Sequence, residues 1–213
     1  MLGSGHSLTI AAGGHPRHAE LSYVLPLPHR RFSAEEYLRL EADSASRSEF
    51  HEGLIYAMTG GSLDHNRIVC NLVHQLRLGL DGSDCEVFSS DVRLAVEAHQ
   101  LFTYPDVLVV CGSPRLFEGR NDTLVDATLI VEVLSPSTES YDRDQKFRFY
   151  RALPSLEEYV TVAQASVLVE QHQRQSDSTW LLREHHSLSQ RLALRSLGVE
   201  IGLEGIYQNI EGL

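Results

Sequence analysis

The sequence has 213 residues, 42% of them hydrophobic and 22% charged, which is the size and composition of one folded domain with a sizeable core. No stretch approaches the roughly 20 apolar residues that a transmembrane helix needs, and the first residues lack the basic-then-apolar pattern of a secretory signal, so we expect a cytoplasmic protein. The formal net charge of −11 argues against tight nonspecific binding to nucleic acid, because that affinity normally comes from excess Lys and Arg.

The chain is expected to begin with a poorly ordered arm over residues 1–28, which contain several Gly, Pro and His residues and little hydrophobic periodicity. A single domain is predicted for residues 29–213. Its first element is a short helix: Ser33, followed three residues later by Glu36, forms a capping box, and the helix extends to about Glu41.

A hairpin and a long helix come next in the predicted order. Residues 47–51 and 54–59 have the character of short strands, and Glu52-Gly53 between them is suited to a tight turn. Residues 62–80 carry apolar side chains at i, i+4 spacing, which predicts a helix with one apolar face, ended by Asp81-Gly82.

The middle of the sequence switches to short apolar runs that predict strands. The near-continuous runs Val107–Val110 and Leu129–Val131 indicate strands covered on both faces, at the centre of a sheet. A helix is predicted over residues 140–153, ended by Pro154, and a weakly patterned tail follows the last strand. The strands are expected over residues 85–89, 92–96, 104–110, 127–134, 158–162, 167–172 and 180–183.

The three cysteines, Cys70, Cys85 and Cys111, are odd in number, widely spaced and form no C-x-x-C pair. This pattern does not indicate a metal knot or a redox motif, and we expect all three to be reduced residues of the core. The eleven histidines are scattered, with no H-x-x-x-H or H-E-x-x-H motif, which argues against a transition-metal protein.

Two carboxylates interrupt the predicted central strands. Asp106 and Glu132 each stand among Val, Leu and Ile residues, where a charged group is costly unless it is paired or binds a cation. Two carboxylates on neighbouring strands suit a hard divalent ion such as Mg²⁺ or Mn²⁺, usually completed by waters and a backbone carbonyl, for which Val133 is the candidate.

The lysine content gives a third candidate, because the sequence has seventeen Arg and a single Lys, Lys146. A lysine can place a compact ammonium beside a water or a small oxyanion, which an arginine does not. In the predicted helix, Asp142, Lys146 and Tyr150 follow at i, i+4, i+8 on one face. The alternative is that Asp142 and Lys146 form an ordinary surface ion pair, which contributes about 0.3 to 0.5 kcal/mol.

These residues resemble a known family in order and spacing. The segment Tyr104-Pro105-Asp106, the run E-V-L-S-P-S-T over residues 132–138 and the D-x-x-x-K of residues 142–146 resemble the Uma-two family of restriction endonucleases, within the PD-(D/E)XK nuclease superfamily. The resemblance covers roughly residues 31–206. It implies a restriction-endonuclease-like α/β (α+β) fold, with a mixed central β-sheet flanked by helices and an N-terminal helix and hairpin.

The superfamily pattern E-x-K places a lysine two residues after the glutamate, but that position is Leu134 in this sequence. The resemblance implies that the lysine has migrated to the following helix, which falls on Lys146. It also implies an early acidic residue before the hairpin turn, at Glu49, which would bind metal directly or through water. Glu52 competes for that role, although its turn position suits a solvated residue better.

Two weaker candidates remain. His65, in the first turn of the long helix, is either a site residue or a cap or surface histidine. Asp91, at the start of a predicted strand, is more often a turn or capping residue. Ser135, Ser137 and Thr138 are interpreted as helix-entry caps rather than nucleophiles, since no G-x-S-x-G elbow accompanies them.

The sequence therefore predicts an endonuclease that hydrolyses DNA, expected to be duplex, through a metal-activated water. Asp106 and Glu132 would hold Mg²⁺ or Mn²⁺, and Lys146 would orient the water or stabilise developing charge. The main alternative is a noncatalytic protein that keeps the nuclease fold as a regulatory or interaction scaffold, as a homodimer. The net negative charge favours this alternative.

Overall fold

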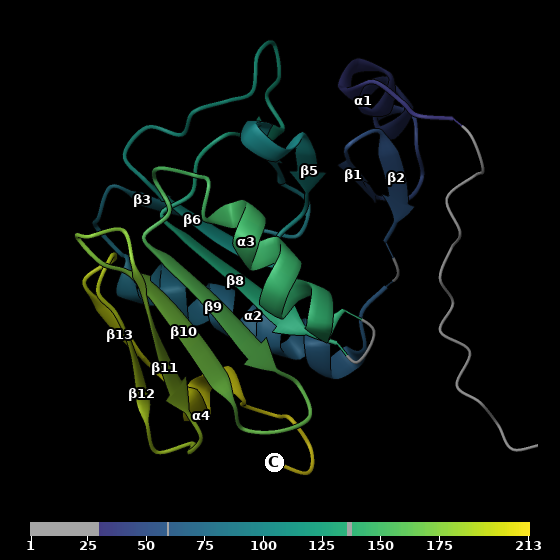
Figure 1. Cartoon of the computed structure of the whole chain (residues 1–213). Coiled ribbons are helices and arrows are strands. Elements are labelled where there is room, and N and C mark those ends of the chain that lie inside the picture. Colours follow the sequence, from purple (N-terminus) through teal and green to yellow (C-terminus); the bar gives the residue numbers. More distant parts are fainter. Residues whose placement is uncertain (1–29, 59, 136–137) are drawn as a thin grey trace, which may run out of the picture.

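The computed structural model describes residues 30–58, 60–135 and 138–213 of the chain (Figure 1). The arm predicted over residues 1–28 lies outside them. The described residues form a six-stranded, a five-stranded and a two-stranded sheet, together with one long helix and several short ones. None of the described helices is long and apolar enough to span a bilayer.

The first described residues form the five-stranded sheet and its covering helix. In α1 (Ala34–Ala42), the Ser33 hydroxyl accepts the Glu36 N–H at 3.1 Å and the Glu36 carboxylate accepts the Ser33 N–H at 2.9 Å, so the predicted capping box is confirmed. Tyr37 stacks on Phe50, with ring centroids 5.1 Å apart, which fixes α1 on the sheet. The strand order is β2-β1-β5-β4-β7, with β1 at Ser48–His51, β2 at Leu54–Ala57, β4 at Arg93–Val96, β5 at Leu101–Thr103, β7 at Thr123–Leu124 and a 3-10 turn, η1, at Glu97–His99.

The predicted hairpin is also confirmed. Strands β1 and β2 pair antiparallel around Glu52 and Gly53, whose φ angles are 46° and 88°. A two-residue turn with both φ angles positive matches the twist of the flanking strands, and glycine adopts such a φ without strain. Because side chains alternate along β1, Phe50 faces α1 and Glu49 faces the other way, towards the larger sheet.

The six-stranded sheet lies between α2 (Leu63–Gly79) and α3 (Phe147–Tyr150), which cover opposite faces (Figure 1). The predicted long helix is confirmed, and the Ser62 hydroxyl caps it by accepting the His65 N–H at 3.0 Å. Strands β8 and β9 pair in parallel, and the helix that carries Lys146 connects them. The strand order is β11-β10-β9-β8-β6-β3, with β3 at Cys85–Ser89, β6 at Val107–Cys111, β8 at Leu129–Leu134, β9 at Glu158–Ala163, β10 at Val169–Arg174 and β11 at Trp180–His185.

The alternation of side chains on β8 decides which face of the sheet each residue serves. Val131 and Val133 pack in the hydrophobic cluster with α2, whereas Ile130 packs in the cluster that contains Tyr150 of α3. Glu132 shares the face of Ile130. Its carboxylate therefore points towards α3.

The C-terminal tail, which the sequence pattern left unassigned, forms β12 (Arg191–Leu194), β13 (Val199–Gly202) and the short helix α4 (Leu203–Ile206). Leu192 and Ile201 are buried in the same cluster as the apolar face of α2. Each of these strands has only four residues, which is too few for hydrophobic alternation to stand out in the sequence.

The single strand predicted over residues 104–110 is wrong, because the chain changes sheets there. Strand β5 ends at Thr103, Tyr104-Pro105-Asp106 crosses between the sheets, and β6 begins at Val107. Proline has no N–H to donate to a strand ladder, which accounts for the break. Asp106 therefore lies just before a central strand rather than within one.

The helix predicted over residues 140–153 is confirmed in place but begins in a different form. Its first described part, η2 (Tyr141–Lys146), is π-helical, and α3 continues it to Tyr150. Such π-helical turns are rare and occur frequently at functional sites. Pro136 and Ser137, in the connection from β8, lie outside the described residues.

The expectation of three reduced core cysteines is wrong. Cys85 and Cys111 face each other across the antiparallel pair β3–β6 and form a disulfide. Cys70 is free and exposed, because it lies off the buried stripe of α2 that contains Ile68 and Leu72. Sequence spacing did not reveal this pairing. The two cysteines are 26 residues apart, and only the register of β3 with β6 places them opposite each other.

Candidate active site

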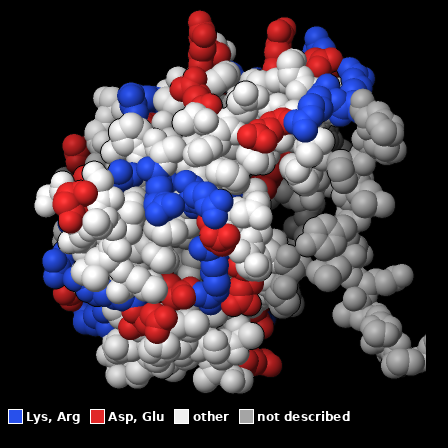
Figure 2. All heavy atoms as spheres, in the orientation of Figure 1, with Lys and Arg blue, Asp and Glu red and all other residues white. Residues whose placement is uncertain are grey.

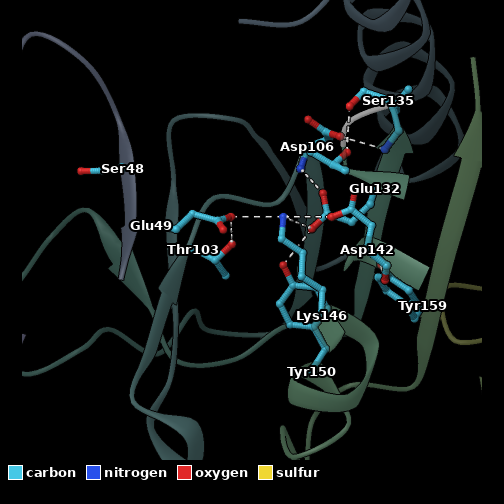
Figure 3. Close-up of polar contacts among 12 residues, drawn as sticks. Ser48, Glu49, Thr103, Asp106, Glu132, Ser135, Asp142, Lys146, Tyr150 and Tyr159 are labelled. Atoms are coloured by element: carbon cyan, nitrogen blue, oxygen red, sulfur yellow. Dashed lines mark hydrogen bonds and ion pairs between the residues drawn. The ribbon is translucent and has the colours of Figure 1, made fainter. Parts of the chain in front are cut away.

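A group of polar side chains is buried between the five-stranded and six-stranded sheets (Figure 3). Glu49 of β1 and Thr103 of β5 come from the smaller sheet, and Glu132 of β8 and Lys146 of η2 come from the other side. Thr103 donates its hydroxyl to Glu49 Oε1 at 2.5 Å, and the same oxygen pairs with Lys146. The site thus joins elements that are far apart in the sequence.

Glu132 is 3% exposed, and three donors hold its carboxylate. Oε1 accepts the Tyr150 hydroxyl at 2.8 Å and Lys146 Nζ at 3.2 Å, while Oε2 accepts the Asp106 backbone N–H at 3.3 Å. Burial, with the nearby charges of Asp142 and Asp106, raises the pKa of Glu132 to about 8 against the opposing effect of Lys146. The surroundings of Glu132 therefore disfavour its ionised form in the absence of a cation.

Lys146 lies among three carboxylates. Its Nζ is 3.1 to 3.3 Å from one oxygen each of Glu49, Glu132 and Asp142. Burial alone would lower the pKa of Lys146, but Glu132 and Glu49 raise it well above its ordinary value, so the side chain is an ammonium. The alternative of a surface ion pair between Asp142 and Lys146 is wrong, since both residues are buried.

Asp106 connects this site to α2. Its Oδ1 lies 3.1 Å from His65 Nε2, and its Oδ2 accepts the Val133 backbone N–H at 2.8 Å. The hydrogen bond with Asp106, opposed by burial, raises the pKa of His65. The structure therefore brings His65 and Val133 to the same place as Asp106 and Glu132.

Three members of the site received no role in the sequence interpretation. Helical spacing placed Asp142 and Tyr150 on the face of Lys146, but it did not show that this face is buried against Glu132. No sequence pattern marked Thr103 as a site residue, because its contact with Glu49 depends on the pairing of β1 with β5. Register between distant strands is not readable from a single sequence.

The remaining candidates lie elsewhere. Asp91 is in a turn before β4, its side chain is 86% exposed, and it pairs with Arg47 at 3.7 Å. Ser135 and Thr138 hydroxyls lie 2.9 Å apart, and the Ser135 carbonyl accepts the Glu139 N–H at 2.9 Å, in keeping with a helix entry. Ser137 lies outside the described residues.

The charge balance of the site suits a divalent cation. Four carboxylates surround one lysine and one histidine, and Mg²⁺ usually takes one or two protein carboxylates and completes its shell with water. Among the described residues, no group of three or more His, Cys, Asp or Glu side chains is arranged to enclose an ion. Carboxylate oxygens are nevertheless the donor type that Mg²⁺ takes. The four carboxylates are those of Glu49, Asp106, Glu132 and Asp142.

The chain is similar to two proteins of Synechocystis sp. (strain ATCC 27184 / PCC 6803 / Kazusa). It is 39% identical over 185 residues to "Uncharacterized protein slr1290", an alignment that covers 86% of this chain and 95% of the relative. It is 38% identical over 152 residues to "Uncharacterized protein sll1609", covering 71% of this chain and 86% of that protein. The name of neither relative assigns an activity.

A solved structure and a family model agree on the fold and the family. The structure, titled "a putative nuclease belonging to DUF820" from Anabaena variabilis ATCC 29413, superposes with a TM-score of 0.68 at 15% identity, over 83% of this chain and 97% of that chain. This likeness confirms the predicted restriction-endonuclease-like fold. The model of the Uma2 family, described as "Putative restriction endonuclease", matches residues 34–204. The chain therefore belongs to the Uma2 family.

Proposed function

We propose that this protein is a metal-dependent endonuclease that hydrolyses phosphodiester bonds of DNA. The observation that carries the proposal is that half-buried Asp106 and buried Glu132 and Lys146 meet in one site, in a chain whose family is described as "Putative restriction endonuclease". Phosphodiester hydrolysis needs a metal ion, an oriented water and positive charge near the developing oxyanion. The three side chains offer groups for each of these needs.

Asp106 and Glu132 would hold Mg²⁺ or Mn²⁺, with the Val133 carbonyl and Glu49 as further oxygen donors. A bound divalent ion supplies polarisation of the phosphate and a lower pKa for its water. Hard oxygen donors and a surplus of negative charge around Glu132 support this choice of ion. His65 would fix the orientation of Asp106 through its 3.1 Å contact with Oδ1.

Lys146 would orient the attacking water and stabilise negative charge on the phosphate. Its ammonium is a compact point charge that can lie beside a small oxyanion, which the broad guanidinium of the other cationic residues cannot do as closely. Glu49, Glu132 and Asp142 hold the Lys146 ammonium in place from three sides. A side chain fixed in this way is already oriented before substrate binds.

Duplex DNA is the proposed substrate even though the net charge is −11. Figure 2 shows Lys and Arg side chains, with Asp and Glu side chains beside them, over the middle of the face that α3 occupies in Figure 1. Arg148 and Arg151 are exposed on this face. The pKa of His172 is lowered to about 4, first by burial and then by the positive charges of Arg143 and Arg151. Local positive charge of this kind supports contact with a phosphate backbone.

Cleavage of supercoiled plasmid and of short duplexes, with Mg²⁺ or Mn²⁺, tests the proposal. We expect metal-dependent cleavage by the wild type and a loss of at least about 100-fold in Lys146→Ala and Glu132→Ala, because each removes a group that acts in the transition state. Equal cleavage by all three proteins would contradict the assignment. A single-stranded DNA and an RNA of the same sequence report the choice of substrate.

The scaffold alternative is favoured by the acidic net charge. The melting temperature with and without Mg²⁺ separates the two functions without any nucleic acid, because an ion that binds the folded state raises it. The nuclease proposal predicts a rise for the wild type and none for Asp106→Ala. A noncatalytic scaffold, as a homodimer, predicts no rise in either protein.

A further inference from the structure

Two donors from one helix meet at a single oxygen of Glu132. The Tyr150 hydroxyl lies 2.8 Å and Lys146 Nζ lies 3.2 Å from Oε1, and the two donors are four residues apart along η2 and α3 (Figure 3). The Asp106 N–H, at 3.3 Å, contacts the other oxygen, Oε2. The tyrosine bond is the shortest of the three, so it restricts the carboxylate most strongly.

Tyr150 is itself held rigidly. The side chain is fully buried, in the cluster that contains Leu108 and Ile130, and its ring centroid lies 5.7 Å from that of Tyr159. A phenol keeps its proton at neutral pH, because its ordinary pKa is about 10. Tyr150 therefore gives Glu132 a fixed neutral donor.

The neutral character of this donor matters because the lysine is shared. Lys146 pairs with Glu49 and Asp142 as well as with Glu132, all within 3.3 Å. Without the tyrosine hydroxyl, Oε1 of Glu132 would depend on Lys146 alone, and the ammonium would be drawn towards it. The hydroxyl satisfies this oxygen and leaves the ammonium positioned between several carboxylates.

We propose that Tyr150 is a positioning residue for Glu132 and Lys146. Its hydroxyl holds the Glu132 carboxylate in the orientation used for the metal and keeps Lys146 from pairing with Glu132 alone. This inference rests on the proposed function, since it concerns the same site. It assigns to Tyr150 a role beyond filling space under the helix.

The test is Tyr150→Phe, which removes the hydroxyl and keeps the ring that fills the core. The matched control is Tyr207→Phe, because Tyr207 is also buried and its hydroxyl also makes one donated bond, to the Leu168 carbonyl at 3.0 Å, far from Glu132 in the fold. Titration calorimetry with MnCl₂ gives the binding constant, and plasmid cleavage gives kcat and KM. Urea unfolding of both variants reports stability.

We expect Tyr150→Phe to bind Mn²⁺ about 10-fold more weakly and to lose about 10-fold in kcat, with KM for the plasmid unchanged, as is typical when a residue that supports a metal ligand is removed. Tyr207→Phe is expected to match the wild type in all three quantities. Wild-type Mn²⁺ binding and kcat in Tyr150→Phe would overturn the inference and leave the proposed function intact. Absence of Mn²⁺ binding in the wild type would overturn both.

If Tyr150→Phe is partly unfolded at 25 °C, the same titration is run at a lower temperature, where urea unfolding shows that the variant is folded. Mn²⁺ binding about 10-fold weaker than that of the wild type supports the positioning role. Wild-type binding overturns it.

Discussion

Two buried glutamates on neighbouring strands are held in opposite ways. Glu158 of β9 is 0% exposed and accepts hydrogen bonds from neutral donors, whereas Glu132 of β8 is 3% exposed and shares its surroundings with a lysine and three other carboxylates. The donors to Glu158 are Gln171 Nε2 at 3.0 Å, the Arg195 and Ser196 N–H groups at 3.3 Å each, and Ser196 Oγ at 2.6 Å.

The contrast distinguishes a carboxylate that serves the structure from the one proposed to act in the site. Glu158 joins β9 and β10 to the turn after β12, so it organises backbone that would otherwise lose its hydrogen bonds. Glu132 lies near Lys146 and other carboxylates, and such buried charged groups are commonly retained for function at some cost in stability. Burial of a carboxylate alone therefore does not identify an active site, whereas a surplus of like charge does.

The largest expected effect on stability is that of Glu158→Ala. Removing this side chain leaves the Arg195 and Ser196 N–H groups and Gln171 without their acceptor, each at a cost of about 1 to 3 kcal/mol, so we expect a loss of about 4 kcal/mol in the free energy of unfolding. Urea denaturation at 25 °C measures it. A loss below about 1 kcal/mol would remove the distinction between the two glutamates.

Glu132→Gln is expected to act in the opposite direction. The amide keeps the shape of the side chain and removes the cost of folding an acid whose pKa is raised to about 8 beside Asp106 and Asp142, so the metal-free protein should gain about 1 kcal/mol in the free energy of unfolding while losing cleavage. Lys146 keeps Glu49 and Asp142 as partners. Urea denaturation in EDTA checks the gain, and a variant clearly less stable than the wild type would show that Glu132 is structural too.

A smaller effect is expected for the loss of stability in acid, which we attribute to His172 on the face of the sheet that α3 covers. His172 of β10 packs on Phe147, with ring centroids 4.2 Å apart, and burial followed by Arg143 and Arg151 lowers its pKa to about 4. The unfolded chain binds a proton near pH 6.5 and the folded chain does not, so stability is full above that pH and falls as the pH drops towards 4. Melting curves at pH 7 and pH 4.5 should show a smaller acid loss for His172→Gln. An unchanged loss would locate the acid sensitivity elsewhere.

The smallest effect is expected for Asp91→Ala. Its side chain is 86% exposed and makes one long ion pair with Arg47, so the variant should stay within about 0.5 kcal/mol of the wild type in unfolding free energy and keep its cleavage rate. Parallel denaturation and plasmid assays check both quantities. A large loss of cleavage would return Asp91 to the list of site residues.

Local sequence signals predicted the local structure well. The capping box at Ser33, the turn at Glu52-Gly53 and the apolar stripe of α2 are each encoded within a few residues, and the structure confirms them. The candidate Glu132 stood out because a charge within a buried run contradicts its surroundings, whereas Asp106 lies just before its strand and is half-buried.

The features that were missed depend on pairing between distant segments. The disulfide of Cys85 with Cys111, the contact of Thr103 with Glu49, and the burial of Asp142 follow from strand register and from the docking of η2 on the sheet. The break at Pro105 has a local cause, the missing N–H of proline, but the four-residue strands of the tail were likewise set by tertiary packing. No signal within one element of the chain carries such information.

Titration of metal-free protein with MnCl₂ tests the central claim most directly, because it needs no knowledge of a target sequence. Wild type, Glu132→Gln and Glu158→Gln are compared by calorimetry at a temperature where all three are folded. The account predicts that wild type and Glu158→Gln bind Mn²⁺ and that Glu132→Gln binds at least about 10-fold more weakly. Equal binding by Glu132→Gln and the wild type, or the absence of binding in the wild type, would contradict a metal-dependent site at Glu132.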